Sequence, residues 1–113
     1  MGILSAILGG GNVSGANIKA FSIKNVIEDY TLEPGYNVIE VNVTNSDIIL
    51  TLPTVDDSFR DLGFVLIKRV DDSAFDLIIR GTSGNYEDDE FILDGLEGTT
   101  IYPSNSNFWR STL

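Results

Sequence analysis

The chain has 113 residues, of which 17 are acidic and 7 basic, giving a net charge of −10, and it contains neither Cys nor His. This length predicts one domain with a modest core. The lack of Cys excludes disulfides and thiolate metal ligands, and the lack of His removes the usual general base and pH switch. We therefore expect no enzymatic activity and no cofactor. The negative charge also argues against binding to nucleic acid or to anionic membranes.

The first 20 residues differ from the rest of the chain, because all acidic residues lie from Glu28 onward. An apolar stretch, too short for the core of a signal peptide, precedes a triple glycine at 9–11. Its four aliphatic side chains are Ile3, Leu4, Ile7 and Leu8. One interpretation is a solvated tail. The other is an attachment arm, residues 1–20, that buries the four side chains on another protein, with the glycines as a flexible joint. Exposed aliphatic side chains reduce solubility, which favours the arm.

From residue 21 the chain consists of short apolar stretches separated by turn signals. The stretches are too short for helices, and most alternate or are rich in β-branched residues. The sequence EPGY at 33–36 is typical of a β-turn, with Gly35 expected at positive φ. We predict eight or nine strands and no helix over residues 21–113. The fold class is all-β, as a small antiparallel β-sandwich or jelly-roll-like barrel.

The same pattern predicts the buried side chains. Strand 63–70 is apolar on both faces at its start, which indicates a central position in a sheet. Residues 54–62 read as a polar loop. The predicted core comprises Phe21, Ile23, Val41, Leu50, Leu52, Phe64, Leu66, Ile67, Leu77, Ile79 and Ile92.

Carboxylates are the most abundant candidates for chemistry. The acidic run 87–90 offers oxygen ligands for Ca²⁺ but lacks the spacing of a known calcium loop, so a solvated loop is the simpler interpretation and we assign no metal site. The pairs Asp56-Asp57 and Asp71-Asp72 are typical of turns in which Asp caps the local backbone. A glycosidase needs two carboxylates in a cleft, and nothing in the sequence indicates one.

Aromatic residues are the candidates for binding a host glycan. Tyr86, in the middle of a polar loop, is expected to be exposed and is the candidate glycan contact. Trp109 is expected to pack, in the core or at a subunit interface, rather than to bind, because aromatic side chains carry a large area for burial.

Six apolar segments together form a recognisable series. They read YTL (30–32), IILTLP (48–53), GFVLIKR (63–69), LII (77–79), ILDG (92–95) and NFW (107–109). In order and spacing they resemble a β module that recurs in bacteriophage tail-fibre, head-fibre and other virion-surface proteins, over residues 29–110. Asp94-Gly95 matches the DG turn of the module, with Gly at positive φ, and Lys68-Arg69 matches its basic pair. The loop before residue 63 is longer and more acidic than in the module, and residues 110–113 are more polar than its usual ending.

The resemblance implies a structural protein of a virion, made in the cytoplasm of a host bacterium. It suggests a capsid decoration or head-fibre subunit, or a tail-fibre component, attached by its N-terminal segment to other virion proteins of the capsid or tail. A homotrimer is expected, because strands with two apolar faces need a neighbour and phage fibres imply three copies. The alternative is an adhesin that binds host surface glycans, and a glycan hydrolase is a distant third.

Overall fold

The computed structural model describes residues 21–112, and these form nine β-strands and one short helix. The elements are β1 (Ile23–Val26), β2 (Tyr30–Thr31), β3 (Val38–Val41), β4 (Ile48–Leu52), α2 (Asp57–Leu62), β5 (Val65–Arg69), β6 (Leu77–Gly81), β7 (Glu90–Leu93), β8 (Gly98–Pro103) and β9 (Trp109–Ser111). The prediction of a domain built mainly from β-strands is confirmed. The predicted attachment arm, residues 1–20 with Ile3, Leu4, Ile7 and Leu8, lies outside the described residues.

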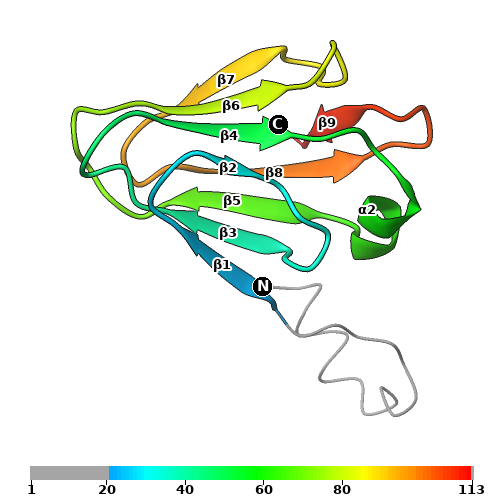
Figure 1. The fold of residues 1–113 in the computed structure, drawn as a ribbon, viewed down its shortest axis with the longest axis horizontal. Helices are drawn as coiled ribbons and strands as arrows, with labels where there is room; N and C mark the ends of the chain where they lie inside the picture. Colours follow the sequence, from blue (N-terminus) through cyan, green and yellow to red (C-terminus); the bar gives the residue numbers. More distant parts are fainter. Residues whose placement is uncertain (1–20, 113) are drawn as a thin grey trace.

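The strands form two sheets that face each other (Figure 1). The first has the order β1-β3-β5-β8-β9 and the second the order β2-β4-β6-β7. From β1 to β6 the chain enters the two sheets alternately, so every second strand is a neighbour and the pairing is parallel. The antiparallel pairs are β5–β8, β6–β7 and β8–β9.

The predicted antiparallel arrangement is therefore wrong for the pairs among the first six strands, and the sheets are mixed. The connections between these strands carry the chain from one sheet to the other. A parallel pair needs a crossover connection, and the strand in the opposite sheet supplies it. The expected central position of strand 63–70 is correct, because β5 is the middle strand of the five-stranded sheet.

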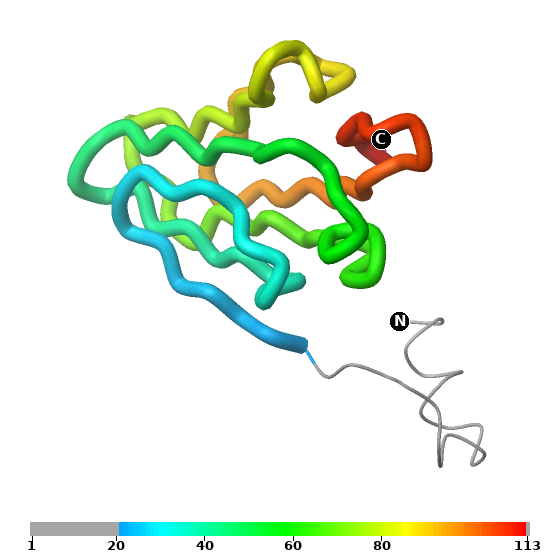
Figure 2. Tube along the Cα trace, turned by 45° about the vertical axis from the view of Figure 1, so that its right-hand side comes forward, coloured from blue at the N-terminus to red at the C-terminus, as the bar shows by residue number. Residues whose placement is uncertain are grey.

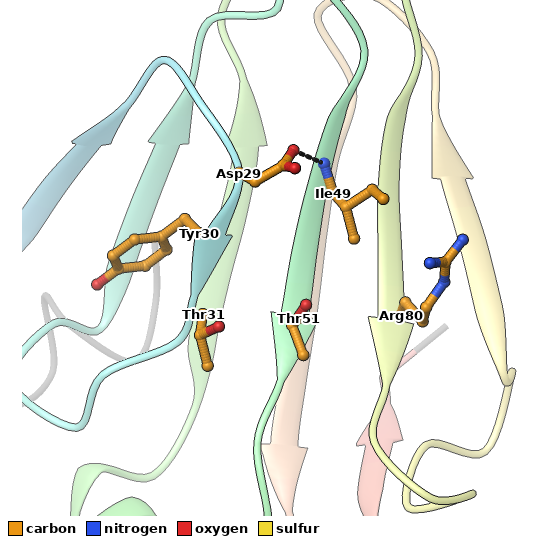
Figure 3. A pocket seen from close by; sticks show the side chains of 6 residues that line it. All are labelled: Asp29, Tyr30, Thr31, Ile49, Thr51 and Arg80. Atoms are coloured by element: carbon orange, nitrogen blue, oxygen red, sulfur yellow. Dashed lines mark hydrogen bonds between the residues drawn. The ribbon is translucent and has the colours of Figure 1, made fainter.

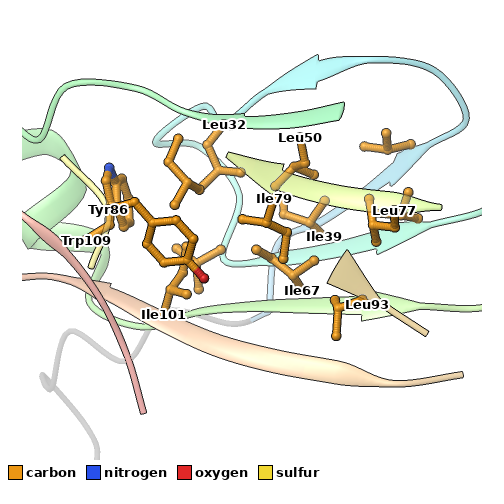
Figure 4. Packing of buried hydrophobic residues seen from close by; sticks show 14 of the residues in the cluster. Leu32, Ile39, Leu50, Ile67, Leu77, Ile79, Tyr86, Leu93, Ile101 and Trp109 are labelled. Atoms are coloured by element: carbon orange, nitrogen blue, oxygen red, sulfur yellow. The ribbon is translucent and has the colours of Figure 1, made fainter. Parts of the chain in front are cut away.

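The core lies between the two sheets (Figure 4). Of the predicted core, six residues are buried: Val41, Leu50, Leu52, Ile67, Leu77 and Ile79. The other five are exposed: Phe21, Ile23, Phe64, Leu66 and Ile92. In β5 and β7 the residues beside the predicted ones, Val65 and Leu93, point inward instead.

Three of these errors, at Phe64, Leu66 and Ile92, have one cause. Side chains alternate between the faces of a strand, so a shift by one residue exchanges the two faces. Where both faces are apolar, as in residues 64–67, the sequence does not indicate which face is buried. Where polar residues mark the outer face, as in β4, the predicted residues are correct.

The short helix α2 is a second departure from prediction, since residues 54–62 were expected to form a loop. Asp56 caps the helix, its carboxylate accepting a hydrogen bond from the Phe59 N–H at 3.2 Å. The helix ends at Gly63, whose φ of 79° suits glycine. Phe59 is buried and anchors the helix to the core. Figure 2 shows α2 at the same end of the domain as the β6–β7 and β8–β9 loops.

Candidate functional site

One end of the sandwich is closed by aromatic side chains, and we call it the aromatic end (Phe59, Tyr86 and Trp109). The Trp109 indole N–H donates to the Pro53 carbonyl at 2.7 Å, and the ring meets Phe59 edge to face at 5.2 Å. The Trp109 backbone bonds to both Asn85 and Glu87. Trp109 thus connects three parts of the chain: the end of β4, α2 and the β6–β7 loop. It is buried in the core, which confirms the prediction that it packs rather than binds.

Tyr86 was expected to be exposed, and that expectation is wrong. Its side chain is 1% exposed and points into the core beside Trp109 (Figure 4). Gly81 allows this approach, because a Cβ there would lie 2.7 Å from the Tyr86 Cβ. Burial raises the pKa of Tyr86, and the nearby Asp88 carboxylate raises it further. A buried ring has no free face for a sugar, so Tyr86 is not a glycan contact.

The opposite end of the sandwich is closed by a buried ion pair, and we call it the charged end (Arg69, Asp71 and Ser73). Arg69 is only 2% exposed and contacts the Asp71 carboxylate at 3.4 Å. Its guanidinium also donates to the Leu93 carbonyl at 3.0 Å and to the Ser73 carbonyl at 2.9 Å. The basic pair of the sequence is therefore divided: Arg69 is buried, while Lys68 lies on the outer face.

Asp71 accepts hydrogen bonds from several donors at the charged end. Its two oxygens accept from the Val43 N–H at 2.8 Å and from the Ser73 hydroxyl at 2.7 Å. Burial acts to raise the pKa of Asp71, but these donors and Arg69 outweigh it and hold the pKa below its ordinary value. The carboxylate is thus ionised and fully engaged, which confirms the interpretation that Asp71 caps local backbone.

The turn at Asp94-Gly95 also belongs to the charged end. A Cβ on Gly95 would lie 2.9 Å from the Asp72 Cα, so glycine is required by close packing. The prediction of positive φ at this glycine is wrong, because the residue with positive φ is Leu96, at 62°. Gly35 likewise lacks positive φ, although the turn forms, with the Tyr36 N–H bonded to the Glu33 carbonyl.

Two of the four carboxylates in the acidic run 87–90 form ion pairs with arginines. Glu87 contacts Arg110 at 3.2 Å, and Glu90 contacts Arg80 at 2.9 Å. The pKa of Glu87 is lowered chiefly by the hydrogen bond from the Ser111 N–H and further by the hydrogen bond from Arg110. Within residues 21–112, no three carboxylates are gathered in a way that would hold a metal ion.

A shallow hollow of about 330 Å³ lies on the outer face of the four-stranded sheet (Figure 3). Its lining residues are Asp29, Tyr30, Thr31, Ile49, Thr51 and Arg80. The register places Thr31, Thr51 and Arg80 in one row across β2, β4 and β6. Asp29 is engaged at the upper rim, where it accepts the Ile49 N–H at 2.8 Å. This hollow could not be predicted from the sequence, because its residues come from β2, β4, β6 and the connection before β2.

The outer face of the five-stranded sheet carries a patch of apolar side chains, which we call the outer patch. It consists of Ile23, Phe64, Leu66 and Tyr102, with Val38 covered to 8% exposure between Ile23 and Leu66. The register places Ile23, Val38 and Leu66 in one row across β1, β3 and β5. Phe64 is 61% exposed. Its ring packs edge to face against the Tyr102 ring, with the two ring centroids 5.7 Å apart. The sequence indicated a surface of this kind, because some predicted strands have apolar residues on both faces.

Comparison of the chain with models of known protein families, with curated proteins and with solved structures found no significant match. Within the described part of the chain, no helix has the length and apolar character needed to cross a membrane.

Proposed function

We propose that the protein is a non-enzymatic structural subunit of a bacteriophage virion surface. It serves as a capsid decoration or head-fibre subunit, or as a tail-fibre component. Residues 1–20 attach it to other virion proteins through Ile3, Leu4, Ile7 and Leu8, and it assembles as a homotrimer. The observation that supports the proposal is the ordered series of six segments, which resembles that of virion-surface β modules.

The contacts made by these segments hold the fold together and form no reactive site, so what they support is a common structural framework. Pro53 and Trp109, from two of the segments, bond to each other at the aromatic end. Arg69 and Gly95, from two others, hold the charged end. A module that keeps the residues closing its two ends keeps its shape, which is what a repeated building block of a particle requires.

The surface of the domain suits assembly better than catalysis. Of the 17 acidic residues, only Glu40 and Glu90 lie in strands, so the acidic charge is concentrated in the connections around the rim. The buried carboxylate Asp71 is fully engaged. The most unusual exposed feature is the outer patch, and contiguous apolar patches of this kind mark interaction surfaces.

The attachment arm provides the test. Particles lacking the protein are mixed with the wild-type chain or with a chain from which residues 2–11 are deleted, and bound protein is measured after sedimentation. We expect the wild-type chain to decorate the particles and the deleted chain, with an unchanged melting temperature, to remain in solution. Decoration by the deleted chain at wild-type occupancy contradicts attachment by the arm. Failure of the wild-type chain to bind any particle contradicts the proposed function.

A second candidate is an adhesin for host glycans, which the hollow of Figure 3 favours. Its threonine hydroxyls and Arg80 offer donors and acceptors at the surface, as sugars require. Arg80→Ala should abolish retention on a glycan array if the hollow binds sugar. Arg110→Ala is the matched control, because Arg110 is a similarly exposed arginine that also pairs with a glutamate. Equal retention of both variants, or no retention of the wild-type chain, counts against the adhesin.

A further inference from the structure

We infer that the outer patch is the surface on which a second copy of this chain packs. The inference rests on the proposed oligomer and identifies its interface, which the sequence did not locate. On this sheet face an aliphatic row, Ile23, Val38 and Leu66, lies in register across three strands, and the exposed Phe64 beside it packs on Tyr102.

Charge is the first argument for a second copy as the occupant. Two molecules of net charge −10 repel each other unless they meet where acidic residues are absent. On the outer face of this sheet Glu40 is the only acidic strand residue, and the register places it beside Lys68. The face is therefore close to neutral, while the acidic connections surround it. A basic partner would be attracted to that rim instead.

The size of the patch is the second argument. Phe64 is 61% exposed, Ile23 49% and Leu66 39%, and Tyr102 extends the same surface. Together these side chains offer roughly 400 Å² of apolar surface. Each partner in a standard interface buries about 800 Å², of which slightly more than half is apolar. The outer patch thus provides the apolar part of one side of such an interface.

The other sheet serves as a comparison. Its outer face carries a row of isoleucines, Ile49, Ile78 and Ile92, but no aromatic pair. Next to that row lies the polar row of Thr31, Thr51, Arg80 and Glu90. Aromatic anchors dominate the energy of protein interfaces. The five-stranded sheet is therefore the face that packs on a neighbour.

The test measures molar mass by sedimentation velocity over a range of concentrations at physiological salt. The variant is Phe64→Glu, which places a charge in the centre of the patch on a side chain that is already exposed. The matched control is Ile92→Glu, since Ile92 is 47% exposed on the outer face of the other sheet. We expect the wild-type chain and Ile92→Glu to form the same oligomer, and Phe64→Glu to weaken association by about 30-fold or more. All three should melt cooperatively.

A wild-type chain that is monomeric at about 100 μM overturns the inference, because interfaces of this size bind more tightly. An oligomer that survives Phe64→Glu, or one that dissociates with Ile92→Glu alone, places the interface elsewhere and also overturns it. If the full chain is monomeric but a chain lacking residues 1–20 associates, the N-terminal segment covers the patch instead. Particle binding separates this inference from the proposed function: a wild-type monomer that still decorates particles refutes the interface and leaves the virion role standing.

Discussion

The two ends of the sandwich are closed by opposite kinds of chemistry. At the aromatic end, Trp109, Phe59 and Tyr86 bury large apolar surfaces, with the indole N–H bonded to the Pro53 carbonyl. At the charged end, Arg69 and Asp71 form an ion pair whose remaining hydrogen bonds go to backbone groups and to the Ser73 hydroxyl. At both ends the strands stop, and their polar groups there need hydrogen-bond partners while the core between the sheets must be covered.

The difference determines how each end responds to its surroundings. Apolar packing depends on shape and changes little with pH. A buried ion pair stabilises only while both groups are charged, and loss of one partner leaves the other charge buried without compensation. Mutations at the two ends should therefore lower the free energy of unfolding by similar amounts at pH 7, but the losses should depend differently on pH.

The largest effect is expected at the aromatic end. Trp109→Ala should lower the free energy of unfolding by about 4 kcal/mol, because it removes the largest buried side chain and leaves a cavity. Denaturant unfolding at pH 7 and pH 4 measures it, and the loss should be the same at both values. A loss below about 1 kcal/mol would show that Trp109 does not hold this end together.

At the charged end, Asp71→Asn should lower the free energy of unfolding by about 3 kcal/mol at pH 7, since it leaves the Arg69 charge buried and unpaired. The native pKa of Asp71 lies below the unfolded value of about 3.9. Its stabilisation is therefore complete well above pH 4 and is lost as the pH falls through the native pKa.

Denaturant unfolding of the wild-type chain and Asp71→Asn between pH 7 and pH 2 tests this dependence. The difference between them should be constant above about pH 5 and shrink below pH 4. Asp72→Asn is the matched control, because Asp72 neighbours Asp71 but shows no ion pair with Arg69. A difference that stays constant down to pH 2 would contradict the ion pair.

A smaller effect is expected from Gly95→Ala, at about 2 kcal/mol, because the new methyl group would overlap the Asp72 backbone. Gly35→Ala is the control, since nothing lies within 4 Å of its Cβ position and its φ is not positive. Gly35→Ala should leave stability unchanged or raise it by about 0.5 kcal/mol. Thermal melts of both variants compare them, and equal melting temperatures would rule out the close packing at Asp72.

The smallest effect is expected at the helix beside the aromatic end. Asp56→Ala removes the cap of α2 and should cost about 1 kcal/mol. Asp57→Ala is the control, because the Asp57 carboxylate is highly exposed and pairs only with Arg60. Chemical denaturation measures both changes. If Asp57→Ala costs more than Asp56→Ala, the surface ion pair matters more than the cap.

The sequence predicted some parts of this fold well. The predominance of β-structure, the number of strands and the buried residues predicted in β3, β4 and β6 follow from alternation in which a polar or charged residue (Glu40, Thr51 or Arg80) marks the outer face. The alternation left β5 and β7 undecided, because both of their faces carry apolar residues. In β1 the alternation was misleading, because Ile23 alternates with Lys24 and is nevertheless exposed. Arg69 lies on the buried face of β5, and its long-range hydrogen bond to the Leu93 carbonyl forms only in the folded chain.

Strand direction and the functional surfaces were harder to predict. A short turn joins strands in one sheet or in two, and its residues do not distinguish the two cases. Tyr86 was placed on the surface because polar residues flank it, whereas Gly81 allows the loop to fold inward. The outer patch and the hollow are assembled from separate strands, so they exist only in the folded register.

The alternating path of the chain also has a consequence for the time course of folding. Strands β1 to β5 have no partner next to them in the sequence, and the two hairpins, β6–β7 and β8–β9, lie in the second half of the chain. During synthesis the first strands therefore emerge from the ribosome before most of their neighbours exist. Pairing across long stretches of chain is slow, so we expect refolding over roughly milliseconds to seconds. The first half of the polypeptide must remain soluble through that interval without the partner strands that will later cover it.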